Sequence, residues 1–593
     1  MNYNVTQALD QTHTGDLMKY FATNDGILEA NSGVHDNKCL SIDASDPPCP
    51  VQKGMYTKLK LTDESIHITN IDKSSITALV RILIKPSTQF WSALNDNNLA
   101  NQADIDVRDL MTCWFVGLKS SSHLFDAYRV YSRNRKTSCE QTEALYENAA
   151  IRMLKAQEEL DYKPGIYTQW KDANQMSECV CGKYFNLKEL KDAVNNTLEL
   201  EFEVTIPMDD FLPFSAMKMF PNCVFGNLTY EVKMAIQQNF VICQVDPIVA
   251  IEKYIKKLHQ TQNNGVNSDA GSIYNAIGTA ILNSPYRILN PNYTRSFTQI
   301  GDTFESSFLR WVGLNEWAEN KLNLHPTLVK TTFLITDGSL RYCRTNINGF
   351  NIKDNVLEAL RSKYTNSSLL IPSQYVDYQA FSQKPLSNGV KCNTTYAMTN
   401  VSALMFLFPR TSNDVTCSKN PLFASLQMQI DNKPYPDKPF SSIEHAHTIF
   451  NITNAGLDGL FSPNEEFGYS LTFNELEYDS NIPIPVGFTP ANYYVSDKDN
   501  TSYCFLCSTE RLSGYGTFCD GITKENAHIT LTGTLLPYQN IHPYLTNPIT
   551  GEKNERSPIM LICQDCFWKC TVQGGCEYIC NNRHFVQEET GTN

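Results

Sequence analysis

The chain has 593 residues, and its composition excludes several classes of protein. Charged residues make up 19% and aromatic residues 11%, unlike the charge-rich, aromatic-poor composition of disordered chains. Asp and Glu number 63 against 49 Lys and Arg, a net charge of −14, and coating nucleic acid requires a cationic surface. We therefore expect no direct or sequence-specific nucleic-acid binding. No apolar run of about 18 residues occurs, so we also expect no transmembrane segment.

The first part of the chain predicts an arm followed by antiparallel strands. Residues 1–50 are polar and aperiodic, which indicates an N-terminal arm. From Leu198 to Ile206 every even position is apolar, which is the period of a strand with one buried face. The same alternation recurs over 228–236. Together with shorter strand patterns, these segments predict a first β series over residues 51–246; the shorter patterns lie at 56, 66–68, 79–84 and 240–245.

Helices are expected at four places before residue 327. Apolar residues at three- and four-residue steps predict a helix over 139–160, with Ser138 as its cap and Gln141 as the capping-box partner. A shorter helix is expected over 187–194. Asp246-Pro247 has the residue order of a helix start, and 304–322 shows an amphipathic pattern. The last two predict a helical connecting region over residues 247–326.

A second β series is predicted over residues 327–570, followed by a polar, mobile C-terminal tail at 571–593. Asp337-Gly338 is expected to form a turn, and Asp431-Asn432 another after the alternating strand 422–430. A short helix is expected at 355–364. Further strand patterns occupy residues 328–335, 401–408, 447–452, 468–473, 528–536 and 558–569. Runs of strands separated by turns are typical of sandwiches and barrels.

The 19 cysteines provide the most specific chemical pattern. Cys504-Phe-Leu-Cys507 and Cys563-Gln-Asp-Cys566 have the C-x-x-C spacing of zinc ligands, and Cys570, Cys576 and Cys580 lie nearby. The N-terminus lacks the basic and apolar regions of a secretory signal, which favours reduced cysteines that pack as small apolar groups. Packing is the favoured interpretation, while zinc binding and disulfide formation by Cys504, Cys507, Cys563 and Cys566 both remain open.

No other motif predicts a catalytic, cofactor or metal site. The sequence contains no phosphate-binding glycine loop, no G-x-S-x-G and no H-E-x-x-H. Glu444-His-Ala-His447 places two imidazoles on one face of a strand, but no third metal ligand is evident. Asp209-Asp210 is expected in a solvated turn, and the four phenylalanines that follow in core positions; these are Phe211, Phe214, Phe220 and Phe225. We therefore expect no enzymatic activity and no cofactor.

Three segments resemble double-jelly-roll major capsid proteins of virophages, Polinton/Maverick elements and adenovirus-like double-stranded-DNA viruses. The first runs from Ile206-Pro-Met-Asp-Asp-Phe-Leu-Pro-Phe214 to the strand 224–234. The second is Leu426-Gln-Met-Gln-Ile430 with its turn and the following Tyr-Pro-x-x-Pro. The third combines 529–538 with 559–568. The order and spacing agree over most of residues 51–570, whereas the segment 247–323 and the cysteine-rich end match no pattern of this family.

The resemblance implies a mainly β fold with two tandem eight-stranded antiparallel jelly-roll sandwiches and helical insertions. It also implies a major capsid protein that forms a pseudo-hexameric homotrimer and tiles an icosahedral shell around a double-stranded DNA genome. The implied partners are further copies of the chain, neighbouring capsomers, and minor and penton capsid proteins. The implied location is the virion capsid, assembled in the cytoplasm or nucleus of the host cell.

Two other functions are compatible with a β protein of this size. One is a carbohydrate- or receptor-binding sandwich of a virion, of the spike or lectin type, which would expose Trp and Tyr at its loop tips. The other is a β-sandwich glycoside hydrolase, whose two carboxylates meet only in space. The six Trp mostly lie within apolar patterns, which disfavours the lectin type.

Overall fold

The structure is a computed structural model that describes, with short gaps, eight stretches of the chain: 34–86, 114–142, 182–244, 295–307, 330–444, 504–509, 521–536 and 544–579. These residues are mainly β, and all strand pairs among them are antiparallel, which confirms the mainly β, antiparallel prediction. Within these stretches, no helix has the length and apolar character needed to cross a membrane.

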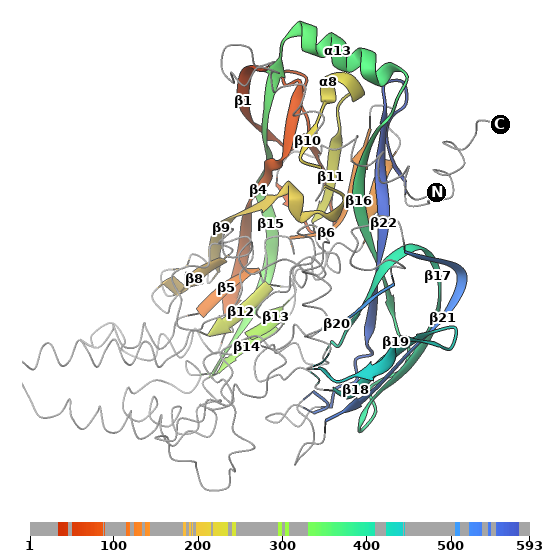
Figure 1. Ribbon diagram of the computed structural model, residues 1–593. Helices are drawn as coiled ribbons and strands as arrows, with labels where there is room; N and C mark the ends of the chain where they lie inside the picture. Colours follow the sequence, from red (N-terminus) through yellow and green to blue (C-terminus); the bar gives the residue numbers. More distant parts are fainter. Residues whose placement is uncertain are drawn as a thin grey trace, which may run out of the picture.

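A first β unit contains three sheets (Figure 1). The seven-stranded sheet comprises β1 (Val34–Asp43), β2 (Val51–Gln52), β4 (Ile68–Pro86), β9 (Leu198–Pro207), β10 (Met219–Phe220), β14 (Thr303–Ser307) and β15 (Lys330–Ile352). A four-stranded sheet has the order β3 (Tyr56–Lys60), β11 (Thr229–Met234), β6 (Phe125–Tyr131) and β7 (Thr137–Gln141). Another has the order β13 (Arg295–Thr298), β12 (Phe240–Gln244), β5 (Trp114–Leu118) and β8 (Gly182–Phe185).

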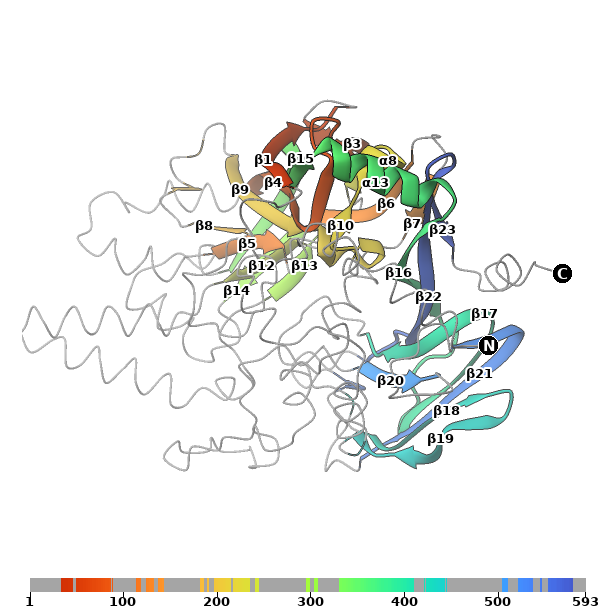
Figure 2. The same ribbon diagram turned by 45° about the horizontal axis from the view of Figure 1, so that its top comes forward.

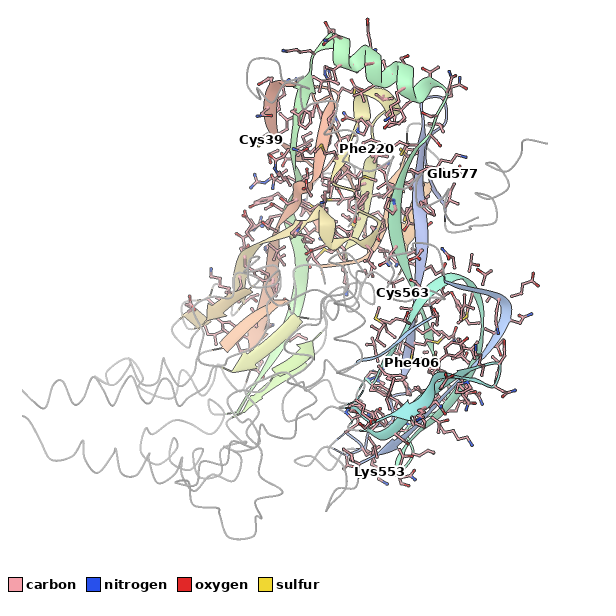
Figure 3. All side chains as sticks on the ribbon, in the orientation of Figure 1. Cys39, Phe220, Phe406, Lys553, Cys563 and Glu577 are labelled. Carbon is pink, nitrogen blue, oxygen red and sulfur yellow. The ribbon has the colours of Figure 1, made fainter. Side chains whose placement is uncertain are left out.

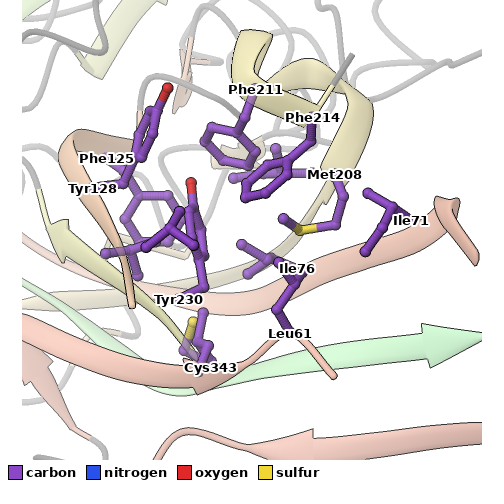
Figure 4. Packing of buried hydrophobic residues seen from close by; sticks show 14 of the residues in the cluster. Leu61, Ile71, Ile76, Phe125, Tyr128, Met208, Phe211, Phe214, Tyr230 and Cys343 are labelled. Carbon is purple, nitrogen blue, oxygen red and sulfur yellow. The ribbon is translucent and has the colours of Figure 1, made fainter. Parts of the chain in front are cut away.

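Alternating side chains build the core of this unit. In β9, Leu200, Phe202, Val204 and Ile206 are buried while the glutamates between them face outward, as the sequence predicts. Short turns after β9, η4 (Met208–Asp210) and η5 (Leu212–Phe214), carry aromatic rings into the core (Figure 4). All four phenylalanines expected in core positions are buried, which confirms that prediction; these are Phe211, Phe214, Phe220 and Phe225.

A second β unit is an eight-stranded sheet with a core of its own. Its main path runs β16 (Leu369–Ala380), β22 (Ile559–Thr571), β17 (Gly389–Leu407), β21 (Ile522–Leu535), β18 (Phe423–Ile430) and β19 (Lys433–Phe440). Outside this path, β20 (Cys504–Ser508) pairs with β17 and β23 (Gly575–Ile579) pairs with β22. The turn between β18 and β19 is confirmed, because Asp431 and Asn432 have φ of 50° and 65°, the left-handed values of a tight hairpin turn.

Strands β16 and β22 extend through both units (Figures 1 and 2). At one end, Leu369 and Trp568 belong to the first core, and at the other, Val376 and Leu561 belong to the second. Cys563 lies on β22 and belongs to the second core (Figure 3). Helix α13 (Asp354–Thr365), predicted from the sequence, covers the end of the first unit and connects β15 to β16.

Several predicted elements are wrong. Residues 139–141 end the strand β7 and 303–307 form β14, so neither the helix predicted from 139 nor the one from 304 begins there. The pair Asp337-Gly338 lies inside β15, where the register shifts against β4, instead of in a turn. In each case pairing with a distant strand overrides the local pattern. The remainder of both helices, residues 247–294 and the strand patterns at 447–452 and 468–473 lie outside the described residues.

Three strands lie where the sequence places other parts of the chain. β1 belongs to the expected arm but pairs with β15 along nearly its whole length. β15 falls in the second predicted β series but pairs with β1 and β4 of the first unit. β23 lies in the expected tail and pairs with β22, so residues 575–579 are not a mobile end.

Candidate functional site

The C-x-x-C segments lie on two strands of the second unit. Cys507 belongs to β20, while Cys563 and Cys566 belong to β22, and all three are buried free thiols. The side chain of Cys504 lies outside the described residues. Among the residues that the structure describes, no three His, Cys, Asp or Glu side chains gather as metal ligands. The three described cysteines are buried in the sheet, where β20 and β22 both pair with β17.

The other two candidate segments are Asp209-Asp210 and Glu444–His447. Asp210 is buried at 1% exposure, so the expectation of a solvated turn is wrong for this residue: η4 turns it inward at the end of β9. Only the first residue of the Glu444–His447 motif is described; it is exposed, and the histidines lie outside the described residues.

The junction between the two units is a polar contact within a buried layer. The indole Nε1 of Trp568 donates a hydrogen bond of 2.6 Å to the carbonyl oxygen of Pro213, which also accepts one of 3.0 Å from Ser373 Oγ. The Trp568 ring stacks on Phe214 at 5.8 Å between centroids. Because Trp568 is on β22 and Pro213 is in η5, this contact joins the long strand to the first unit.

Two more hydrogen bonds connect the edge strand β7 with β23 and β16. Ser138 Oγ donates to the carbonyl oxygen of Cys576 on β23 at 2.8 Å. Gln141 Nε2 donates to the carbonyl oxygen of Val376 on β16 at 2.7 Å. From the sequence, Ser138 and Gln141 are expected to cap a helix. Their residue types thus predict that both side chains form hydrogen bonds, but not with which partners. In both contacts a side chain donates a hydrogen bond to a backbone carbonyl oxygen at a strand edge. Without this donor, the carbonyl oxygen could pair with another strand.

The outer face of the seven-stranded sheet carries a ladder of ion pairs. Arg81 on β4 approaches Glu199 on β9 at 2.7 Å, and Arg341 on β15 approaches the same carboxylate at 2.6 Å. Arg341 also pairs with Glu201 at 2.8 Å. The hydrogen bond from Arg81, with that from Arg341, lowers the pKa of Glu199 to about 2. The outward Glu of the alternating β9 pattern was visible in the sequence, whereas its arginine partners were not.

A polar groove of about 970 Å³ lies between β3, β6, β11 and α8 (Asn222–Phe225) of the first unit. Glu231, 8% exposed, accepts a hydrogen bond of 2.9 Å from the Tyr131 hydroxyl and lies 3.8 Å from Arg129. Arg129 also pairs with Glu140 at 2.8 Å and lies over the Tyr56 ring at 4.4 Å. In this groove Arg129 is thus paired with two carboxylates, and Lys58 and Glu64 add further charged groups to the lining.

Comparison with known proteins finds similarity only at the level of structure. No family model and no curated protein matches the chain. The mavirus major capsid protein is 9% identical over 95% of this chain and 95% of its own, with a TM-score of 0.45. The Sputnik virophage structure is 8% identical over 94% and 93%, with a TM-score of 0.46. The PBCV-1 virus capsid is 8% identical over 92% and 96%, with a TM-score of 0.42.

The first of these structures is of a major capsid protein, the second is of a virophage and the third is of a virus capsid. With identities of 8–9% and TM-scores below 0.5, however, the likenesses do not assign a family or an activity to the chain.

Proposed function

We propose that the chain is the major capsid subunit of a double-stranded-DNA virus or virus-like mobile element. In this proposal the two β units are the two jelly rolls implied by the sequence resemblance. Three chains form a pseudo-hexameric homotrimer, and these trimers tile an icosahedral shell. The observation that carries the proposal is the pair of strands, β16 and β22, that run through both hydrophobic cores.

A shell subunit must transmit force between its contacts without bending. Two units joined only by a linker would move relative to each other. Here the twelve register pairs between β16 and β22 continue from one core into the other, and the Trp568–Pro213 hydrogen bond closes the junction. Bending at the junction would therefore break buried hydrogen bonds and apolar contacts, each of which is costly to lose. This supports a single block in which the two units do not move independently, as the proposal of a rigid tile requires.

The proposal also accounts for the net charge of the chain and implies its partners. A net charge of −14 keeps subunits soluble before assembly and disfavours direct contact with DNA. The partners are then further copies of the chain, neighbouring capsomers, and minor and penton proteins at the vertices. The place of action is the virion capsid, after assembly in the cytoplasm or nucleus, and we propose neither a catalytic role nor a cofactor.

The state of assembly tests the proposal. Purified full-length protein is examined by light scattering coupled to size-exclusion chromatography and by negative-stain electron microscopy. We expect a mass near three times 67.1 kDa and particles with a hexagonal outline. A folded protein with a β-type circular dichroism spectrum that remains monomeric at all concentrations would contradict the proposal.

The polar groove favours a second function, binding of a carbohydrate or receptor at the virion surface. Its Tyr131, Glu231 and Arg129 present hydroxyl, carboxylate and guanidinium groups of the kind that recognise sugar hydroxyls. A glycan array with wild-type protein and the Tyr131→Phe variant distinguishes this function. Binding that the variant loses would support it, and an array without any binding would exclude it for the glycans tested.

A further inference from the structure

We propose that Cys570 and Cys576 are a modification site: a cross-strand pair that forms a reversible disulfide and fastens the edge strand β23 to β22. This inference does not depend on the proposed capsid function. The two cysteines lie near the C-terminus and belong to neither of the C-x-x-C segments considered as zinc ligands.

The strand register places the two cysteines directly opposite each other. Cys570 on β22 pairs with Cys576 on β23, just inside the tight turn that begins after Thr571. Directly opposite residues of antiparallel strands have Cα atoms about 4.5–5.5 Å apart, within the range of about 4.4–6.8 Å found for disulfides. The two Sγ atoms lie 2.7 Å apart. Small rotations about the Cα–Cβ bonds are therefore enough to form the bond.

Both thiols are shielded by the first core. Cys570 is 0% and Cys576 is 4% exposed, and both belong to the first hydrophobic core together with Trp568. Burial is the main cause that raises the pKa of Cys570, which makes its reactive thiolate scarce in the closed fold. Exchange must then occur when β23 opens, as an edge strand does more readily than a central one. The same burial protects the finished disulfide from reducing thiols.

The strand that the disulfide fastens also contacts the first unit. The carbonyl oxygen of Cys576 accepts the hydrogen bond from Ser138 on β7, and Tyr578 of β23 donates one of 2.9 Å to the carbonyl oxygen of Gln374 on β16. Fixing β23 to β22 thus also holds the contact between β7 and the C-terminal strands. The oxidised chain should open less at this junction than the reduced chain.

The oxidant is a low-molecular-weight disulfide such as oxidised glutathione. The thiolate of one cysteine attacks a sulfur of the small disulfide, which forms a mixed disulfide and releases one small thiol. The thiolate of the second cysteine then attacks the protein sulfur of that mixed disulfide and releases the second small thiol. Two protein thiols lose two electrons, the small disulfide gains them, and the two protons pass to the released thiols.

The test begins with full-length wild-type protein that is fully reduced and then equilibrated with oxidised glutathione. After denaturation and alkylation, peptide mass spectrometry maps the remaining thiols. We expect a peptide that joins Cys570 to Cys576 and is two hydrogens lighter than the reduced form. Cys392 is the matched control, because it is also buried at 1% exposure on a strand, but its partner on β21 is Leu531. It should remain fully alkylated.

The consequence for the strand is measured by hydrogen–deuterium exchange of residues 577–579. Oxidation should slow exchange severalfold in the wild type and leave it unchanged in the Cys576→Ser and Cys570→Ser variants. Full alkylation of both cysteines, a stable mixed disulfide without the internal bond, or a link to another cysteine would each overturn the proposal. The mapping of the wild type decides the question even if a serine variant does not fold.

Discussion

The outward faces of the two β units differ although their strands follow the same alternation. In the first unit, Glu199 and Glu201 of β9 meet arginines of β4 and β15 in a charged ladder. In the second, the exposed positions of β17 and β21 are mostly neutral, as at Asn393, Thr532 and Thr534, but Lys391, Lys524 and Glu525 are exposed as well. Lys524 pairs with Asp431 at 2.6 Å. A period of two therefore fixes which side chains are buried, whereas the choice of outward residues decides whether a face responds to pH and salt.

The largest effect is expected from removing the large ring that β22 places in the first core, on a strand that also reaches the second core. Trp568→Ala deletes the largest of the fully buried side chains in the described part of the chain, along with its hydrogen bond to Pro213 and its stacking on Phe214. We expect a loss of about 3–5 kcal/mol in unfolding free energy. Because the junction is lost as well, urea unfolding followed by fluorescence and circular dichroism should separate into two transitions.

Phe406→Ala is the matched substitution within the second unit. Phe406 is fully buried and packs against Phe381 and Phe505, but it does not take part in the junction. A similar loss of about 3–5 kcal/mol is expected, confined to the second unit. If Trp568→Ala unfolds in a single step while Phe406→Ala gives two, the long strands do not couple the units through Trp568.

Buried asparagines provide a second comparison. Asn222 in the first unit donates from Nδ2 to the carbonyl oxygens of Asp63 at 2.9 Å and Ile66 at 2.6 Å. Asn222→Ala leaves both carbonyls without this donor, which should cost about 1–3 kcal/mol. In the second unit, Asn400 Nδ2 donates to the carbonyl oxygen of Asp565 at 3.1 Å, and the residue has φ of 48°, a strain that glycine would relieve.

The two asparagines should therefore differ in whether glycine and alanine substitutions have unequal effects on stability. At Asn400, the glycine variant should be more stable than the alanine variant in thermal unfolding, because the left-handed backbone dominates. At Asn222, the two variants should lose similar amounts, because the lost donor dominates. Equal losses for all four variants would show that neither the backbone nor the donor distinguishes the sites.

Two glycines, one in each β unit, test how much space the packing leaves for a Cβ atom. A Cβ on Gly349 in β15 would lie 2.4 Å from the carbonyl oxygen of Ile68, a backbone atom that cannot rotate away. A Cβ on Gly533 in β21 would first meet Leu426 Cδ1 at 2.6 Å, the end of a flexible side chain. Gly349→Ala should cost about 1–3 kcal/mol, and Gly533→Ala less. Calorimetry of the two variants tests the order, and the reverse order would contradict it.

The same contrast explains what sequence patterns could predict. β9 and the Asp431-Asn432 hairpin were recognisable, because their alternation and turn residues are local. β15 was placed in the wrong β unit, because its partner Arg81 lies more than 250 positions before Ser339 and no local pattern encodes that pairing. Trp568 lies in an apolar run that predicts burial, but not that β22 passes from one core into the other. The Cys570–Cys576 contact likewise depends on a hairpin in a segment that reads as a polar tail.

The smallest expected effect tests the charged face alone. The folded-state pKa of Glu199 is about 2 against an ordinary value of 4.5, chiefly because Arg81 donates a hydrogen bond to its carboxylate. Its stabilising contribution is thus complete above pH 4.5 and is lost as the pH falls toward 2. Since the side chain is 41% exposed, solvent screening should limit that contribution to below about 1 kcal/mol.

Glu199→Gln removes this titration while keeping the shape of the side chain, and Gln427→Glu on the neutral face of β18 serves as the control for added charge. Between pH 5 and 2, thermal unfolding of wild-type protein should lose more stability than that of the Glu199→Gln variant, and high salt should narrow the gap because it screens exposed pairs. The depressed pKa of Glu199 comes from two arginines on different strands. If wild type and Glu199→Gln lose stability with falling pH in parallel, these ion pairs contribute no net stability. The difference between the two faces would then affect solubility alone.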